Sequence, residues 1–243
     1  MTILVVSDIH ANRIALEAVI ANATSHSPVS AMWVLGDTVG YGAQPNECIE
    51  RVRVEGALVV AGNHDHAAIG KIDVTTFNKY AAEAAIWTSK ILQEENKKYI
   101  ASLPLVATKY DCTLAHGTPR DPIWEYLITA EVAVANLDHF ETAGCAVGHS
   151  HIPFLLRMPQ SSMAPVVYET DVVLDIGKHR YFFNPGSVGQ PRDNDPRASY
   201  VLFDPDACTL EFRRTNYNVQ LAQSLIEEAG LPQILADRLK VGH

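Results

Sequence analysis

The sequence predicts a fold of the α/β (α+β) class, in which two β-sheets pack together and helices lie outside them. Short apolar runs alternate with amphipathic stretches up to Ala61, which is typical of parallel strands joined by helices. From Leu105 onward short strands follow one another closely, which favours antiparallel pairing in a second sheet. The chain has 243 residues and is 47% apolar, so a single domain over residues 1–243 is the simplest organisation.

The first part of the chain alternates strands with helices. Strands are expected at Thr2–Val6, Ala31–Leu35 and Ala57–Ala61, where short apolar runs occur. Helices are expected at Asn12–Ala23, with Asn12 as a plausible cap, and at Pro45–Val54, with proline in the first turn. The long stretch Phe77–Leu103 predicts one amphipathic helix, or two with a break.

The second part of the chain is dominated by short strands. They are expected at Leu105–Lys109, Thr113–Ala115, Cys145–Val147, Phe154–Arg157, Val166–Tyr168, Val172–Asp175, Tyr181–Asn184, Tyr200–Phe203 and Thr209–Arg213. Helices are expected at Ala130–Leu137, Val219–Glu228 and Gln233–Lys240.

Charge and composition exclude several classes of function. The net charge of −9 gives an acidic surface that repels nucleic acid and anionic lipid, so we expect no general nucleic-acid binding. The four cysteines form no CxxC pair, which argues against a zinc finger or a redox motif and suits a reducing cytosol. No apolar stretch approaches the ~18 residues of a membrane span, and the first residues lack a signal-peptide pattern. We therefore expect a cytoplasmic protein.

Polar side chains that can bind metal collect at the ends of five predicted strands. They are Asp8 and His10 in "SDIH", Asp37 in "LGD", the run "GNHD" at 62–65, His116 in "LAHG", and His149 and His151 in "VGHSH". Any one of them alone is more often a turn or capping residue. Ligands bind beyond the carboxyl ends of strands in open α/β sheets, so five such ends together predict a metal site.

The donor types narrow the choice of metal. Imidazole and carboxylate without thiolate suit Zn, Fe, Mn, Ni or Co, and the sequence leaves the choice among them open. Four His, two Asp and one Asn are too many donors for one tetrahedral ion. The set suits two divalent ions about 3.5–4 Å apart that share a carboxylate and lower the pKa of bound water toward ~7.

The ordered motifs "SDIH…GD…GNHD…H…GHSH" resemble the calcineurin-like metallophosphoesterase superfamily. The resemblance implies a β-sandwich of two mixed sheets with helices on both outer faces. It also implies that Asp8, His10 and His151 hold one metal ion and that Asn63, His116 and His149 hold the other, bridged by Asp37. In-line attack by metal-bound hydroxide, without a phosphoenzyme, would follow.

The resemblance gives the residues after Asn63 separate roles. His64 would lie beside the substrate and protonate the leaving oxygen or stabilise the transition state, and Asp65 would orient His64. His66 has no implied role, and we interpret it as a loop or helix-start residue. Gly62 would allow a tight turn after the strand.

The sequence departs from the family pattern after the bridging aspartate. Gly40 stands where many members have aspartate. Tyr41 and Ala61 stand where the protein Ser/Thr phosphatases have arginine, which argues against that branch. The segments "GDTVGYGAQPNE", "HGTPRDPIWEYL" and "NPGSVGQPRD" are similar to a group of small prokaryotic phosphoesterases.

Several residues are candidates for contacts to the substrate, and two of them have a second interpretation. Asn12 binds phosphate or caps a helix, and Arg120 binds phosphate or pairs with Asp121 or Glu125. Arg192 is a weaker candidate for phosphate binding. Tyr41 and Tyr126 are candidates for lining the pocket.

The leading functional hypothesis is a two-metal phosphoesterase that hydrolyses phosphodiesters or small phosphorylated metabolites. One alternative is a pyrophosphatase for nucleotides or dinucleoside polyphosphates, and another is a non-catalytic metal-binding scaffold. The presence of every ligand position and of His64 favours catalysis over the scaffold. The sequence leaves open whether the chain forms a homo-oligomer.

Overall fold

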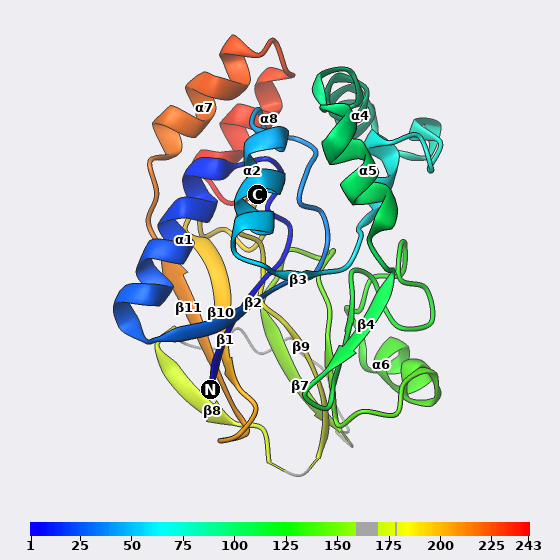
Figure 1. Ribbon diagram of the computed structural model, residues 1–243, viewed down its shortest axis with the longest axis vertical. Coiled ribbons are helices and arrows are strands. Elements are labelled where there is room, and N and C mark those ends of the chain that lie inside the picture. Colours follow the sequence, from blue (N-terminus) through cyan, green and yellow to red (C-terminus); the bar gives the residue numbers. More distant parts are fainter. Residues whose placement is uncertain (159–169, 178) are drawn as a thin grey trace.

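The computed structural model describes residues 1–158, 170–177 and 179–243, so the predicted strand Val166–Tyr168 lies outside the described residues (Figure 1). One sheet has six strands: β1 (Thr2–Val6), β2 (Val29–Val34), β3 (Leu58–Val59), β8 (Val172–Asp175), β10 (Ala198–Asp204) and β11 (Thr209–Thr215). Their order is β3-β2-β1-β10-β11-β8. The first three strands of the chain are parallel, and β10, β11 and β8 continue the sheet in antiparallel pairs.

The other sheet has five strands: β4 (Val106–Lys109), β5 (Cys112–Ala115), β6 (Gly144–Ala146), β7 (Phe154–Met158) and β9 (Arg180–Asn184). Their order is β4-β5-β6-β9-β7. The three central strands are parallel, and β4 and β7 pair antiparallel at the edges. The helix α6 (Ala130–Asn136) lies between β5 and β6 in the chain and forms the crossover that parallel neighbours need.

The other α-helices are α1 (Arg13–His26), α2 (Pro45–Val54), α3 (Asn63–Ala68), α4 (Lys79–Ile91), α5 (Glu94–Ser102), α7 (Val219–Glu228) and α8 (Gln233–Asp237). Short 3₁₀ helices are η1 (Val74–Thr76), η2 (Leu137–His139) and η3 (Arg238–Lys240). In Figure 1, α1 lies on one side of the strands and α6 on the other, while α4, α7 and α8 gather at one end. The expected class, two mixed sheets flanked by helices, is confirmed.

The alternation of side chains along β1 explains why its sequence is apolar throughout. Ile3 and Val5 belong to the core between the sheets, with Trp33 and Phe183. Leu4 and Val6 face the opposite way, into a second core under α1. A strand that is buried on both faces has apolar residues throughout, instead of alternating polar and apolar residues. A third cluster, which includes Phe154 and Phe182, packs the five-stranded sheet against α6.

Two expectations about the strands need correction. The strands after Leu105 do not all pair antiparallel, because β5, β6 and β9 are parallel. They also do not all join a second sheet, because β8, β10 and β11 return to the sheet of β1. Strand spacing along the chain indicates hairpins, but it carries no information about which sheet a distant strand joins.

The predicted helices agree with the structure apart from their ends. Asn12 caps α1, because its Oδ1 accepts a hydrogen bond from the main-chain N–H of Ala15 at 3.1 Å. The long stretch after Phe77 forms two helices, separated at Leu92 and Gln93, which have extended backbone angles. None of the described helices is long and apolar enough to cross a membrane.

We expect the substitution Phe183→Ala to lower the free energy of unfolding by about 3–5 kcal/mol, because it leaves a cavity between the sheets. Val173→Ala is the control, because Val173 is 60% exposed on the edge strand β8 and its truncation should change stability by about 0.5 kcal/mol or less. Chemical denaturation of both variants measures the difference. A Phe183→Ala protein as stable as the wild type would contradict the central position of this side chain.

Candidate metal centre and substrate pocket

The candidate site residues converge where strands of both sheets end. Each is almost fully buried: Asp8 and His10 after β1, Asp37 after β2, Asn63, His64 and Asp65 in the first turn of α3, His116 after β5, and His149 and His151 after β6. The structure therefore brings every predicted metal-ligand position into one region. The short helix α3 was not predicted, although a glycine followed three residues later by an acidic residue is a possible start signal.

Several of these residues have left-handed backbone angles that non-glycine residues rarely adopt. The φ angle is 52° at Asp8, 48° at His10, 52° at Asp37, 67° at His149 and 60° at His151. Each such residue costs of the order of 1–3 kcal/mol and persists only where its surroundings hold it in place. The loops hold one another here, because the N–H of His10 donates to the carbonyl of Asp37 at 2.9 Å.

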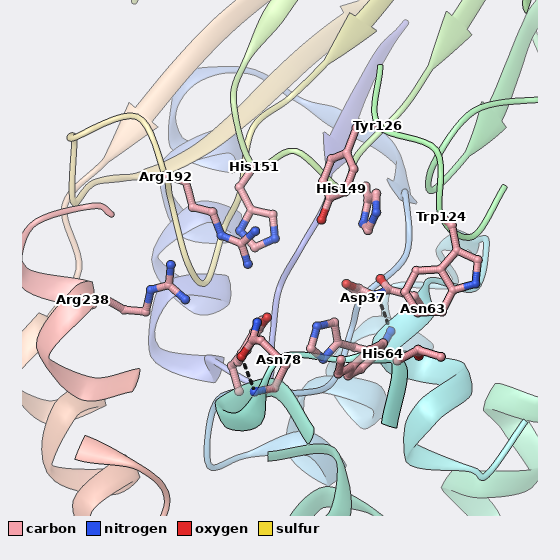
Figure 2. A pocket seen from close by; sticks show the side chains of 14 residues that line it. Asp37, Asn63, His64, Asn78, Trp124, Tyr126, His149, His151, Arg192 and Arg238 are labelled. Atoms are coloured by element: carbon pink, nitrogen blue, oxygen red, sulfur yellow. Dashed lines mark hydrogen bonds between the residues drawn. The ribbon is translucent and has the colours of Figure 1, made fainter. Parts of the chain in front are cut away.

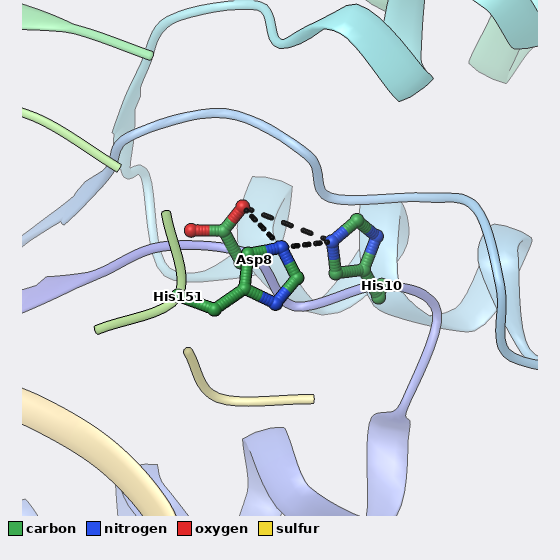
Figure 3. Close-up of side chains that lie close together, drawn as sticks. All are labelled: Asp8, His10 and His151. Atoms are coloured by element: carbon green, nitrogen blue, oxygen red, sulfur yellow. Dashed lines mark hydrogen bonds and ion pairs between the residues drawn. The ribbon is translucent and has the colours of Figure 1, made fainter. Parts of the chain in front are cut away.

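The first ligand cluster consists of Asp8, His10 and His151 (Figure 3). The Nε2 atoms of the two histidines are 3.1 Å apart. Oδ1 of Asp8 lies 3.3 Å from Nε2 of His151 and 3.7 Å from Nε2 of His10. This oxygen is buried, and none of the described residues donates a hydrogen bond to it.

The second cluster consists of Asp37, Asn63, His116 and His149. Nε2 of His116 lies 3.1 Å from Oδ1 of Asn63 and 3.1 Å from Nδ1 of His149. Oδ2 of Asp37 lies 3.4 Å from Nε2 of His116 and 3.7 Å from Nε2 of His10. Asp37 is thus the carboxylate that lies between the two clusters.

The hydrogen bonds of the histidines show which nitrogens are free to bind a cation. Nδ1 of His10 is 3.2 Å from the carbonyl of Val39, and Nδ1 of His116 is 2.8 Å from that of Leu35. Nδ1 of His151 is 2.5 Å from the carbonyl of Gln190. A carbonyl only accepts, so these Nδ1 atoms carry the protons and the Nε2 lone pairs point into the clusters. Lone pairs and carboxylate oxygens that converge without donors fit divalent cations.

The protonation equilibria differ among the ligand positions. Burial lowers the pKa of His10, His149 and His151, which keeps the imidazoles neutral as ligands must be. Burial alone would raise the pKa of Asp37, but its neighbours His116 and His64 outweigh burial and hold it well below the usual range. The site therefore favours an ionised Asp37 beside three neutral imidazoles. Asp37 also outweighs burial at His116 and raises the pKa of that imidazole to about 9, so His116 must lose a proton to bind a cation.

The predicted contact between Asp65 and His64 is wrong. Both oxygens of Asp65 accept main-chain hydrogen bonds, from Val39 at 3.1 Å and from Gly62 at 3.0 Å. Nδ1 of His64 is buried without a partner. Asp65 therefore joins the start of α3 to the loop after β2, and it affects His64 only through the backbone.

Gly40 and Gly62 are required by close packing at the site. A Cβ atom on Gly40 would lie 2.6 Å from Nδ1 of His64, and the φ of +92° also favours glycine there. A Cβ atom on Gly62 would lie 2.1 Å from Oδ1 of Asp37. The φ of Gly62 is −104°, so space rather than an unusual turn explains this glycine.

A pocket of about 230 Å³ opens onto the clusters (Figure 2). The ring of Tyr126 stacks on His149 with ring centroids 3.9 Å apart. His64 contacts Tyr41 and Phe77, with centroid distances of 4.3 and 4.8 Å. The contribution of Tyr41 and Tyr126 to the pocket lining agrees with their candidacy from sequence.

The two predicted substrate contacts are in structural positions instead. Asn12 is buried, and beyond capping α1 it donates from Nδ2 to the carbonyl of Gly189 at 3.1 Å. The guanidinium of Arg120 forms an ion pair with Glu125 and does not line the pocket. Glu125 also accepts from Thr118 at 2.6 Å, so this network holds the loop that carries Tyr126.

Other pocket residues were not singled out from the sequence. They include Phe77, Asn78, Trp124 and Arg238, and the weak candidate Arg192 lines the pocket with them. No spacing in the sequence connects Arg238 with His149, because η3 and β6 are far apart along the chain. The "NPGSVGQPR" segment at 184–192 was the only sequence signal for the side of the pocket that Arg192 and Arg238 line.

Comparison with known proteins agrees with the site geometry. A model of the calcineurin-like phosphoesterase superfamily domain matches residues 1–207. An uncharacterised protein of Methanocaldococcus jannaschii is 41% identical over 246 residues, which cover 99% of this chain and 98% of that protein. The crystal structure of a metallophosphoesterase from Sphaerobacter thermophilus has a TM-score of 0.92 at 46% identity, covering 100% of this chain and 99% of that one.

A more distant structure shows the same fold. The crystal structure of a hypothetical protein from Pyrococcus horikoshii is 18% identical and has a TM-score of 0.82. The match covers 100% of this chain and 98% of that one.

We expect divalent metal to stabilise the protein through these clusters. Metal at 100 times its dissociation constant should raise the free energy of unfolding by about 2.7 kcal/mol. His151→Ala and His116→Ala should each lower the metal content measured by elemental analysis, because each removes a donor from a different cluster. His26→Ala, an exposed residue in the last turn of α1, is the control. Unchanged metal content in both cluster variants would contradict the assignment.

Proposed function

Because the chain belongs to the calcineurin-like phosphoesterase superfamily, we propose that it is a two-metal phosphoesterase that acts on phosphodiesters or small phosphorylated metabolites. The observation that carries the proposal is the position of Asp37. Its Oδ2 lies within 3.7 Å of a histidine from each cluster, at the base of a pocket. One carboxylate shared between two sets of donors is the arrangement that a binuclear centre needs.

The chain provides separate donors for two divalent ions, of Mn, Fe, Zn, Ni or Co. Asp8, His10 and His151 would hold one ion, and Asn63, His116 and His149 would hold the other, with Asp37 shared. When bound, such ions polarise the phosphoryl group and supply hydroxide near neutral pH. The main-chain N–H of His64 donates to Oδ1 of Asp37 at 2.9 Å, which orients the shared carboxylate.

His64 is the residue we assign to the leaving group. Burial lowers its pKa to about 4, so the ring is neutral near pH 7 and still donates one hydrogen bond. This favours stabilisation of the leaving oxygen by an N–H donor over transfer from a charged imidazolium. The alternative is a ligand role, because His10, Asp37 and His64 also offer ligand atoms within 4.8 Å of one another.

The volume and the lining of the pocket indicate which class of substrate it can bind. A volume of about 230 Å³ suits a small molecule, and Gly40 and Tyr41 replace the aspartate and arginine of the protein-phosphatase motif. A pyrophosphatase for nucleotides is the second candidate, because Trp124 is 39% exposed at the pocket and aromatic faces stack on bases. Product analysis on dinucleoside polyphosphates and on simple diesters separates the two candidates.

We expect hydrolysis of bis-p-nitrophenyl phosphate with Mn²⁺ or Ni²⁺, and a fall in kcat of about 10²–10⁴-fold in His64→Ala with metal content unchanged. His66→Ala is the matched control from the same helix, because His66 does not line the pocket. Full activity in His64→Ala would remove His64 from the mechanism. A parallel loss of metal would instead make His64 a ligand.

We expect Gly40→Ala to misplace His64 without removing metal. The added methyl group would overlap the imidazole ring, and a displacement of about 1 Å can cost about 10²-fold in rate. Steady-state kinetics, metal analysis and a crystal structure of the variant test this. Gly56→Ala is the control, because Gly56 also has a positive φ, of 61°, but a Cβ atom there meets no neighbour within 4 Å. Equal losses in both variants would point to general destabilisation.

A further inference from the structure

Two arginines line one wall of the pocket. Figure 2 shows Arg192 between Arg238 and His151, on the side away from Trp124. Arg192 lies in the loop between β9 and β10, and Arg238 begins η3, so the fold brings together two distant segments. Two positive side chains that face the same small pocket repel each other unless an anion lies between them.

Neither arginine forms an ion pair with an Asp or Glu side chain in the described part of the chain. Other arginines do pair with Asp or Glu: Arg13, Arg51, Arg53, Arg120, Arg197, Arg213 and Arg214. Arg192 donates from Nη2 to Oε1 of Gln190 at 3.0 Å, and its Nε is buried without an acceptor. Arg238 donates from Nε to the main-chain oxygen of His243 at 2.6 Å. Burial and the nearby Arg192 lower the pKa of Arg238.

Tyr41 packs beside both the ligand clusters and Arg192. Its ring centroid is 4.7 Å from that of His10 and 4.3 Å from that of His64. The guanidinium carbon of Arg192 is 5.9 Å from the same ring centroid. An anion held by the arginines would therefore lie in the same pocket as a phosphoryl group at the clusters.

We propose that Arg192 and Arg238 form a subsite for a second anionic group of the substrate, a phosphate or a carboxylate. The substrate class is then small phosphoesters that carry two anionic groups, one at the clusters and one at the arginines. The proposal rests on the proposed function for the position of the reacting phosphoryl group. Guanidinium groups suit phosphate and carboxylate because they donate two parallel hydrogen bonds.

The test measures binding, so it does not depend on turnover. Linear alkane bisphosphonates with one to four methylene groups are titrated calorimetrically into the Mn²⁺-loaded protein, each against the alkylphosphonate of equal chain length. We expect at least one bisphosphonate to bind about tenfold or more tightly than its monophosphonate partner. If the bisphosphonate and the monophosphonate of every pair bind the wild-type protein with nearly equal dissociation constants, the proposal is overturned.

Variants then locate the second group. In Arg192→Gln and Arg238→Gln the ratio of the two dissociation constants should fall toward one, because each variant removes a donor from the subsite. Lys240→Gln removes the same charge from the exposed end of η3 and should keep the wild-type ratio. A ratio that persists in both arginine variants would place the second anion elsewhere and overturn the proposal.

The result also separates this proposal from the function on which it rests. A preference for bisphosphonates that the arginine variants abolish, in a protein that hydrolyses no phosphoester, would support the subsite and reject the phosphoesterase. Hydrolysis of simple phosphodiesters without any such preference would support the enzyme and reject the subsite.

Discussion

The burial of Asp37 is the constraint on which the site depends. Its carboxylate is fully buried between histidines from both clusters, and it also accepts the N–H of His64. A buried carboxylate must be paired or neutralised, since transfer of an isolated charge from water is very costly. Asp37 therefore requires the cluster around it, and Gly62 is needed to leave room for it. The ends of β2, β3 and β5 meet at this one side chain.

The same constraint explains why the loops carry backbone strain. A strand that simply continued would point alternate side chains to opposite faces. The left-handed residues after β1, β2 and β6 change the direction of the chain within a few residues, so that ligands from different strands meet. Hydrogen bonds between the loops, such as Gly148 N–H to the carbonyl of His116 at 2.8 Å, hold these turns in place. The cores on both faces of β1 give the turns a rigid base.

Electrostatics connects the site with the acidic character of the chain. At a net charge of −9, the surface opposes the approach of a phosphorylated ligand. Divalent ions in the clusters would reverse that field locally, and Arg192 and Arg238 would extend the positive region along one wall of the pocket. The arginines elsewhere are mostly neutralised by Asp or Glu. The two pocket arginines differ in having no Asp or Glu partner among the described residues.

The sequence alone predicted much of the fold and the chemistry of the metal-ligand set. Asp8, Asp37 and His149 follow apolar strands, and the strand pattern with the polar ends predicts that they converge. The amphipathic patterns placed the helices to within a few residues, because burial of one helix face is a local property. The assignment of β8 and β10 to the sheet of β1 was not predictable, because strand pairing over such separations depends on the packing of the whole core.

The tertiary structure alone decided the roles of individual polar residues. In the sequence, Asp65 adjoins His64, yet its carboxylate binds the main chain of Gly62 and Val39 instead. Arg120 is near His116 along the chain but pairs with Glu125, whereas Arg238, from the far end, faces the pocket. Residue type determines which ligands a side chain can bind, and the sequence gives the residue type directly. The direction in which a side chain points depends on backbone angles and on competing hydrogen-bond partners, which only the folded chain specifies.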